Sequence, residues 1–332
     1  MNTETFSPPW WAKSPHVQTI LPVLTKVDRP ELTRQRIELD DGDFIDLDWL
    51  AAPKPSQPLL VLLHGLEGSA DSHYIRRMLR LCQQRNLAAV VHHHRNCSGE
   101  NNRLARSYHS GDTGDIAQVL AQLKQAHPDS PILAVGYSLG GNVLTKYLGE
   151  QQHNSLIDAG VVVSAPLQLA ACAERLKSGF SRVYQSHLIK QLQQKVHDKL
   201  SDAKLASQMP VQATQVSQLT TFHLFDDQVT APLHGFNGVE DYYNKSSGLP
   251  YLQHIAKPTL VLHAADDPFM NDAVIPNKSQ LSDSVVYELH PRGGHVGFIN
   301  GGTPLSPQYY LEPRVVDFLY SQLRYKRHAS SI

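Results

Sequence analysis

The sequence predicts an open α/β fold, in which a mostly parallel sheet is covered by helices on both faces. Short apolar runs alternate along the chain with stretches of helical periodicity, and this alternation is the pattern of a doubly wound sheet. The central runs are solid blocks of Leu, Val, Ile and Ala without polar alternation. Such blocks are typical of parallel strands that are buried on both faces.

The composition places the whole chain, residues 1–332, in a single globular domain. Of the 332 residues, 41% are hydrophobic, which is enough for one large core that carries an inserted segment. The 30 Lys and Arg nearly balance the 31 Asp and Glu, so no field of one sign would draw the protein onto nucleic acid or an anionic membrane. We therefore expect neither a nucleic-acid partner nor stable membrane insertion, and leave the oligomeric state open.

Cysteine and histidine usage indicates a reducing compartment and no metal site. Cys82, Cys97 and Cys172 are too few and too scattered for a disulfide framework or a structural zinc site. Residues 1–11 lack the basic and apolar stretches of a signal peptide, so the expected location is the cytoplasm. Three consecutive histidines, 92–94, end a predicted strand, where their side chains diverge and cannot converge on one ion.

The strands are predicted in order from the apolar runs. Segments 34–39 and 44–50 alternate in polarity and are joined by Asp41-Gly42, so the sheet should begin with an antiparallel hairpin. Further strands are expected at 59–64, 88–93, 132–136, 159–164, 259–263 and 285–289. Helices are expected at 72–84, 112–125, 139–150 and 307–325.

Residues 170–252 interrupt this rhythm without a convincing buried strand. The segment is polar and helix-like over 174–205, then loop-like and aromatic over 222–243. We expect it to be an insertion over the carboxyl edge of the sheet, where open α/β proteins bind their ligands. The insertion is therefore a candidate helical cap within the single domain.

One serine lies in the sequence context of a nucleophile. The segment Gly136-x-Ser138-x-Gly140 follows the apolar run 131–135 and precedes a helical stretch, so it matches G-x-S-x-G in its strand–turn–helix setting. Small residues two positions before and after the serine let a sharp turn pass while the hydroxyl stands above the sheet. This context predicts an α/β-hydrolase fold with Ser138 as the nucleophile.

Candidate acid and base residues follow two later strands. A serine hydroxyl needs a histidine within reach and a carboxylate behind that histidine, and in this fold the chain order is serine, acid, histidine. The strand predicted at 259–263 leads to Asp266 and Asp267, and the strand at 285–289 leads to a loop that contains His295. We therefore expect His295 to be the catalytic base.

The two neighbouring aspartates are alternatives for the acid. Residues that leave a strand in succession point in opposite directions, so only one of them can face His295. Relatives of this fold often read His-Gly-x-x-Asp, and the segment from His263 to Asp267 matches that spacing. We expect Asp267 to be the acid and Asp266 to turn toward backbone amides or solvent.

Two backbone amides are candidates for an oxyanion hole. The helix after Ser138 aims its first N–H groups at charge that develops there, which makes the Leu139 amide the first candidate. A second donor should come from a His-Gly-x loop after an earlier strand. His64-Gly65-Leu66 fits this description, so the Leu66 amide is the second candidate and His64 is expected to brace the loop.

These motifs resemble the YheT-like α/β-hydrolases, bacterial proteins akin to the yeast ethanol acyltransferase/esterases and the mammalian ABHD hydrolases. The resemblance spans nearly the whole chain. Beyond the motifs above it includes 15–19, 95–99, 108–113 and a spaced pattern of single positions over 226–267. Asn96 stands where the family usually has glycine, a departure that bears on a loop angle and not on the chemistry.

The resemblance implies a serine esterase that needs no cofactor. Its substrates would be carboxylic esters with short- to medium-chain acyl groups or lipid esters, cleaved through an acyl-enzyme on Ser138. Phe236, Tyr242 and Tyr243 are candidates to line an acyl pocket, and an ordinary core role suits each of them equally well. An alcohol acyltransferase with the same acyl-enzyme and a catalytically silent binding protein are the alternatives.

Overall fold

The computed structural model describes residues 6–329, and its main sheet has eight strands. The interpretation of residues 1–11 thus falls partly outside the described residues. The strand order across the sheet is β1-β2-β4-β3-β5-β6-β7-β8. The strands are β1 (Thr33–Glu38), β2 (Phe44–Ala51), β3 (Leu59–Leu63), β4 (Ala88–His92), β5 (Ile132–Tyr137), β6 (Ala159–Val163), β7 (Thr259–Ala264) and β8 (Val285–His290).

Strand directions confirm the predicted sheet. β1 pairs antiparallel with β2, and β2 pairs antiparallel with β4. The remaining neighbours, from β4 through β3, β5, β6 and β7 to β8, are parallel. The predicted hairpin is therefore the antiparallel start of an otherwise parallel sheet.

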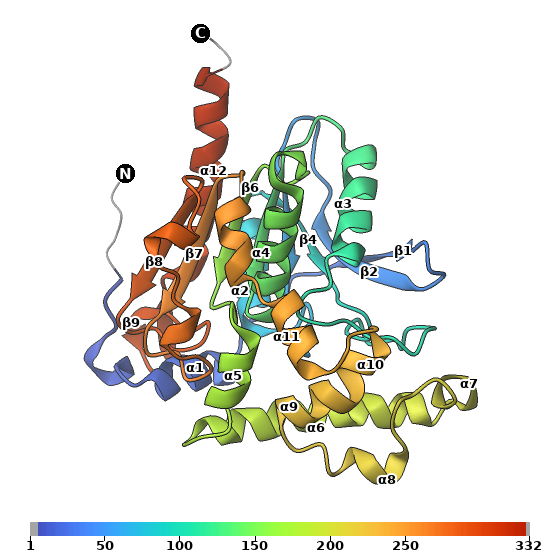
Figure 1. Cartoon of the computed structure of the whole chain (residues 1–332). Coiled ribbons are helices and arrows are strands. Elements are labelled where there is room, and N and C mark those ends of the chain that lie inside the picture. Colours follow the sequence, from blue (N-terminus) through green and yellow to red (C-terminus); the bar gives the residue numbers. More distant parts are fainter. Residues whose placement is uncertain (1–5, 330–332) are drawn as a thin grey trace.

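Helices cover both faces of this sheet (Figure 1). Alternate residues of β3 belong to two different hydrophobic clusters: Leu59, Val61 and Leu63 pack with helices on one face, Leu60 and Leu62 with helices on the other. A strand buried on both faces explains the apolar blocks in the sequence. The first face carries α3 (Gly114–Ala126) and α4 (Leu139–Gln151), and the second carries α2 (His73–Gln84) and α12 (Leu311–Ala329).

Nine helical segments connect β6 to β7, and those within residues 181–225 lie together across the lower part of Figure 1. Several of them share a hydrophobic cluster of their own, which includes Ile189, Val196 and Phe225. The segments are α5 (Leu169–Arg175), α6 (Ser181–Leu200), α7 (Ala203–Ala206), α8 (Ala213–Val216), α9 (Phe222–Phe225), the π-helix η3 (Asp226–Thr230), α10 (Ala231–Leu233), α11 (Val239–Ser246) and the 3₁₀ helix η4 (Leu249–His254).

The prediction that residues 222–243 form mainly loops is wrong. Much of this stretch is helical, in segments so short that no periodic pattern marks them in the sequence. Gly235 and Gly238 have φ angles of +73° and +90°, so they interrupt the helices where other residues would be strained. Tyr242 and Tyr243 are buried and pack in one hydrophobic cluster with Leu169, Ala231 and Val239.

The helix expected at 307–325 begins later than predicted. A hairpin of β9 (Ile299–Thr303) and β10 (Ser306–Tyr309) precedes it, and α12 begins at Leu311. Proline is tolerated in this two-stranded hairpin because an edge strand leaves one side without ladder bonds. Among residues 6–329, no helix has the length and apolar character that a bilayer crossing requires.

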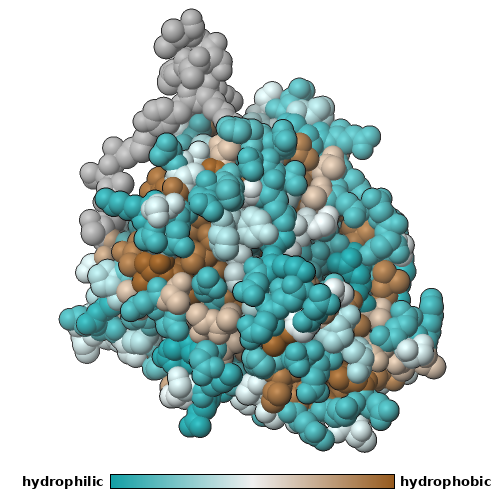
Figure 2. All heavy atoms as spheres, viewed as in Figure 1, coloured by the Kyte–Doolittle hydropathy of each residue, from teal (hydrophilic) through white to brown (hydrophobic). Residues whose placement is uncertain are grey.

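β8 forms one edge of the sheet, and its Val286 and Leu289 side chains are exposed. Figure 2 shows a hydrophobic patch on the side of the molecule where Figure 1 places β8. On this strand the Glu288 carboxylate accepts hydrogen bonds from Tyr310 (2.6 Å) and Arg314 (2.7 Å), and from His290 (2.7 Å). Burial opposes ionisation, yet the donors hold the pKa of Glu288 at about 2, below its ordinary 4.5.

Glu288→Gln is expected to lower the free energy of unfolding at pH 7 by about 1 kcal/mol, after discounting for partial exposure. The carboxylate contributes its stability above the ordinary pKa and loses it as the pH falls from 4.5 toward 2. The difference between wild type and variant should therefore shrink over that interval. Urea unfolding at several pH values measures it, and a difference that grows toward acid would contradict the expectation.

Candidate active site

Ser138 lies in the turn between β5 and α4, at the carboxyl end of the strand. Its φ angle is +51°, a conformation that costs a residue with a side chain roughly 1–3 kcal/mol. A Cβ atom at Gly136 would lie 2.4 Å from the Gly140 carbonyl oxygen, and one at Gly140 would lie 2.4 Å from the His64 carbonyl oxygen. Both glycines are therefore required by close backbone packing, which also brings the His64 loop against the serine.

Ser138, His295 and Asp267 form a chain of hydrogen bonds. His295 Nε2 lies 2.9 Å from Ser138 Oγ, and His295 Nδ1 lies 2.8 Å from Asp267 Oδ2. A carboxylate accepts only, so Nδ1 carries the proton and Nε2 is left to accept one from the serine. The Phe269 ring stacks on the imidazole at 4.0 Å, and its amide donates to Asp267 Oδ1 at 2.8 Å.

Asp266 faces away from the imidazole and braces the histidine loop. Its Oδ1 accepts a hydrogen bond from the Gly294 amide at 2.9 Å. Burial raises the pKa of Asp266, and the amide bond only partly offsets this effect. The two neighbouring aspartates thus contact different groups, as expected for successive residues at the end of a strand.

Helix α1 (Pro15–Leu24) supports the histidine loop from the N-terminal part of the chain. The His295 amide donates to Thr19 Oγ1 at 2.9 Å, and the buried Gln18 side chain both accepts from and donates to the backbone of Ile299. A Cβ atom at Gly294 would lie 2.6 Å from the Pro15 carbonyl oxygen. Sequence reasoning noted this segment only through the family resemblance and did not assign it a contact.

Leu66 and Leu139 both line the same cavity as Ser138. In the described part of the chain, neither amide N–H donates a hydrogen bond to another protein group. Leu139 is the first residue of α4, where an N–H group has no partner within the helix. Both amides are therefore free to bind an oxygen beside the serine.

The loop that carries Leu66 is held by His64, as expected from the sequence, and by the hydroxyl groups of Tyr74 and Tyr108, for which the sequence predicted no such contact. The Tyr74 hydroxyl accepts from the Gly65 amide at 2.9 Å, and the Tyr108 hydroxyl accepts from the Glu67 amide at 2.8 Å. The His64 Nδ1–H donates to the Gly65 carbonyl at 2.7 Å. Burial lowers the pKa of His64 well below its ordinary value, so this imidazole is neutral and braces the loop.

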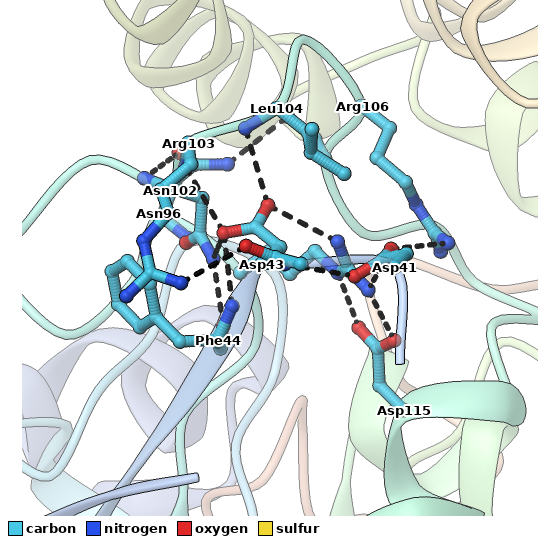
Figure 3. A network of polar contacts seen from close by, with 12 residues as sticks. Asp41, Asp43, Phe44, Asn96, Asn102, Arg103, Leu104, Arg106 and Asp115 are labelled. Atoms are coloured by element: carbon cyan, nitrogen blue, oxygen red, sulfur yellow. Dashed lines mark hydrogen bonds and ion pairs between the residues drawn. The ribbon is translucent and has the colours of Figure 1, made fainter. Parts of the chain in front are cut away.

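A network of charges, of which Arg95, Asp43 and Asp115 are buried and Asp41 is exposed, anchors the segment that leads to Tyr108 (Figure 3). The Arg95 guanidinium forms ion pairs with Asp41 (2.8 Å), Asp43 (3.1 Å) and Asp115 (2.6 Å). It thereby joins the β1–β2 hairpin to α3, and burying these charges is tolerable because they are paired and hydrogen-bonded.

Asn96 adopts a left-handed backbone conformation. Its φ angle is +61°, in the left-handed region that asparagine tolerates better than most residues. Its amide donates to Asn102 Oδ1 at 2.5 Å, and the Asn102 amide donates to Asn96 Oδ1 at 2.9 Å. Asparagine therefore replaces the usual glycine without opening the loop.

The cavity above Ser138 lies between the core loops and the helices of the insertion, and its volume is about 140 Å³. Tyr242 and Tyr243 line it, whereas Phe236 contacts the Tyr242 ring from outside. The apolar lining from the chain between β6 and β7 includes Leu169, Ala173, Leu176, Leu188, Leu192, Val196, Met209, Phe222, Phe225, Val229 and Leu233.

The family described as "alpha/beta hydrolase fold" matches residues 58–302 of the chain. The chain belongs to the α/β-hydrolase family. This α/β-hydrolase is 45% identical over 315 residues to "Putative esterase YheT" of Escherichia coli (strain K12), covering 94% of this chain and 92% of that protein. It is 28% identical over 317 residues to "Phospholipase ABHD3" of Homo sapiens, and the match covers 92% of this chain and 76% of that protein. The expected resemblance to YheT-like hydrolases is confirmed.

Solved structures support the same fold. The esterase Pf2001 of Pyrococcus furiosus superimposes with a TM-score of 0.57 at 17% identity, covering 88% of this α/β-hydrolase and 92% of that chain. At this sequence identity, the similarity supports a shared fold and does not establish a shared function. The predicted α/β-hydrolase fold is confirmed.

Proposed function

We propose that this α/β-hydrolase cleaves carboxylic esters through an acyl-enzyme on Ser138. The observation that carries the proposal is the hydrogen-bonded chain from Ser138 through His295 to Asp267, which opens on a cavity with a mostly apolar lining. The esterase name of the Escherichia coli relative points to the same bond type. A catalytically silent binding protein would have no need for this alignment.

In the proposed mechanism, His295 Nε2 takes the proton of Ser138 Oγ as the oxygen attacks the ester carbonyl. The carbonyl oxygen becomes negatively charged and accepts hydrogen bonds from the Leu66 and Leu139 amides, each worth about 3–4 kcal/mol when judged by removal of one donor. The alcohol leaves with the proton from His295. A water molecule, deprotonated by the same imidazole, then releases the acid, while Asp267 holds the working tautomer.

The substrate class follows from the lining of the cavity. Apolar side chains of the insertion face Ser138 across it, so an acyl chain would be bound by burial of its methylene groups. We therefore propose short- to medium-chain acyl or lipid esters as substrates, with residues 170–252 acting as a cap. The lipase and phospholipase names of more distant relatives are in keeping with such substrates.

A fluorophosphonate probe is expected to label wild-type protein at Ser138, because an activated serine beside two amide donors attacks phosphorus as it attacks a carbonyl. Mass spectrometry of the labelled peptide identifies the residue, and Ser138→Ala should remain unlabelled. Equal labelling of the two proteins would contradict the assignment.

A panel of p-nitrophenyl esters of graded acyl length then defines the acyl preference. Hydrolysis in the presence of added ethanol separates the two fates of the acyl-enzyme. Free acid as the main product supports hydrolysis, and ethyl ester as the main product would instead identify an alcohol acyltransferase.

A further inference from the structure

Helix α6 of the insertion carries two lysines, four residues apart, that both reach the core of the domain. Lys199 Nζ donates to the carbonyl oxygens of Ala105 (2.5 Å) and Arg106 (2.8 Å) and to Ser107 Oγ (2.9 Å). Lys195 instead reaches the loop that carries Leu66. Residues at this spacing share one face of a helix. One face of α6 therefore contacts two core loops, the loop that carries Leu66 and the loop of residues 105–107.

Lys195 forms a largely buried ion pair with Glu67. Its Nζ lies 2.9 Å from Glu67 Oε2, and the two side chains are 23% and 4% exposed. Burial opposes the charge, but the neighbouring Cys97 and Glu67 raise the pKa of Lys195. Lys195 Nζ also donates a hydrogen bond to Cys97 Sγ at 3.1 Å, and burial raises the pKa of that thiol to about 11.

Glu67 controls the peptide unit that follows Leu66. Its φ angle is +54°, a conformation that persists only where the surroundings hold it. The Tyr108 hydroxyl accepts from the Glu67 amide at 2.8 Å and donates to Glu67 Oε1 at 2.7 Å. The carboxylate is therefore clamped between Tyr108 and Lys195, and its position sets the backbone on one side of Leu66.

The peptide unit on the other side of Leu66 is held by the core alone. The Gly65 carbonyl, which belongs to the same peptide unit as the Leu66 N–H, accepts from His64 Nδ1 at 2.7 Å and from the Gly68 amide at 3.0 Å. Among the described residues of the insertion, Lys195 is the one whose side chain hydrogen-bonds to this loop. The core groups therefore set the direction of the Leu66 N–H, and the Glu67 clamp limits how far the backbone after Leu66 can move.

We propose that Lys195 and Glu67 are positioning residues that couple the seating of helix α6 to the direction of the Leu66 amide. This inference rests on the proposed function, because it assigns the loop a role in binding the developing oxyanion. When α6 is seated, Lys195 completes the clamp on Glu67 and the Leu66 N–H points at the site of charge development. When the pair is broken, the backbone after Leu66 gains freedom, the Leu66 N–H is held less precisely, and transition-state binding weakens more than substrate binding.

Lys195→Met and Glu67→Gln test the coupling, with Lys190→Met as a matched control. Lys190 is exposed on the same helix and makes none of these contacts. Each pair variant is expected to lower kcat for a p-nitrophenyl ester by roughly 10- to 100-fold, below the roughly 100- to 1,000-fold cost of losing an oxyanion donor outright. Because both side chains also line the cavity, kcat and not KM is the quantity compared. The control should match wild type.

A tetrahedral inhibitor provides a readout that a merely structural role would not move. An alkylboronic acid forms a tetrahedral adduct on an active serine and places an oxygen where the ester oxyanion would lie. Its inhibition constant should rise by about the same factor as kcat falls. The kcat of the double variant should be no lower than that of the less active single variant, because the two residues act as one unit. Lys195→Arg should recover part of the lost kcat.

The contacts of Lys199 keep α6 docked in the Lys195 variants, and circular dichroism with thermal unfolding confirms that each protein is folded. Should Lys195→Met fail to fold, Glu67→Gln and Lys195→Arg carry the same comparison. Folded pair variants with wild-type kcat, or with lowered kcat and an unchanged inhibition constant, would overturn the coupling and leave the esterase function standing. An inactive, unlabelled wild-type protein would instead remove the proposed function itself.

Discussion

Ser138→Ala is expected to lower kcat for ester hydrolysis about a millionfold, the scale observed when the nucleophile of a serine triad is removed. The Ser138 hydroxyl oxygen forms the ester bond of the acyl-enzyme. In the described part of the chain, no other serine lies within hydrogen-bonding distance of His295 Nε2. The fold should be unchanged, because alanine keeps the Cβ atom and the turn is shaped by its flanking glycines. Steady-state hydrolysis of a p-nitrophenyl ester measures the loss.

Circular dichroism is the control for this variant, and the fluorophosphonate probe provides an independent check. A folded variant that kept more than about one hundredth of wild-type kcat would exclude Ser138 as the nucleophile. The reaction would then have to proceed without the acyl-enzyme proposed above.

Asp267→Asn should lower kcat roughly ten-thousandfold, because an amide in place of the carboxylate favours the wrong tautomer of the histidine. Asp267 Oδ2 accepts the Nδ1–H of His295, and an asparagine side chain can offer N–H there instead. The proton would then sit on Nε2, which could no longer accept one from Ser138. KM should change little, since Asp267 does not line the cavity.

The neighbouring residue offers a matched control for this change. Asp266→Asn removes the same charge one residue away, yet Asp266 Oδ1 contacts the Gly294 amide and not the imidazole. Its kcat should therefore fall far less, with some loss of thermal stability as the histidine loop loosens. A large kcat loss in Asp266→Asn beside near-normal Asp267→Asn would reverse the assignment of the acid.

The parts of the fold that sequence reasoning predicted well are those with a strong local signal. Solid apolar blocks such as Leu59–Leu63 form strands because both of their faces are buried, and this burial excludes polar side chains. Ser138 is recognisable because Gly136 and Gly140 are required by backbone contacts within a few residues of it. Local requirements of this kind leave a pattern in the sequence.

Features that depend on distant contacts left no such pattern. The short helices between Thr221 and Ser247 are stabilised by packing against the core, and helices of one turn are too short to show a period. Thr19 and Gln18 hold the histidine loop from about 280 positions away, and Tyr74 and Tyr108 hold the Leu66 loop through their hydroxyls. Only the three-dimensional arrangement shows which polar groups these side chains serve.

The position of the insertion also affects how the protein is synthesised. Ser138 and His295 are 157 positions apart, and at about 5–20 residues per second the ribosome needs roughly 10 to 30 seconds to translate that interval. Over most of this time the nascent chain lacks Asp267, and until its end it lacks His295. Because the hydroxyl is a poor nucleophile without its base, the unfinished chain is protected from premature acylation until the C-terminal third folds.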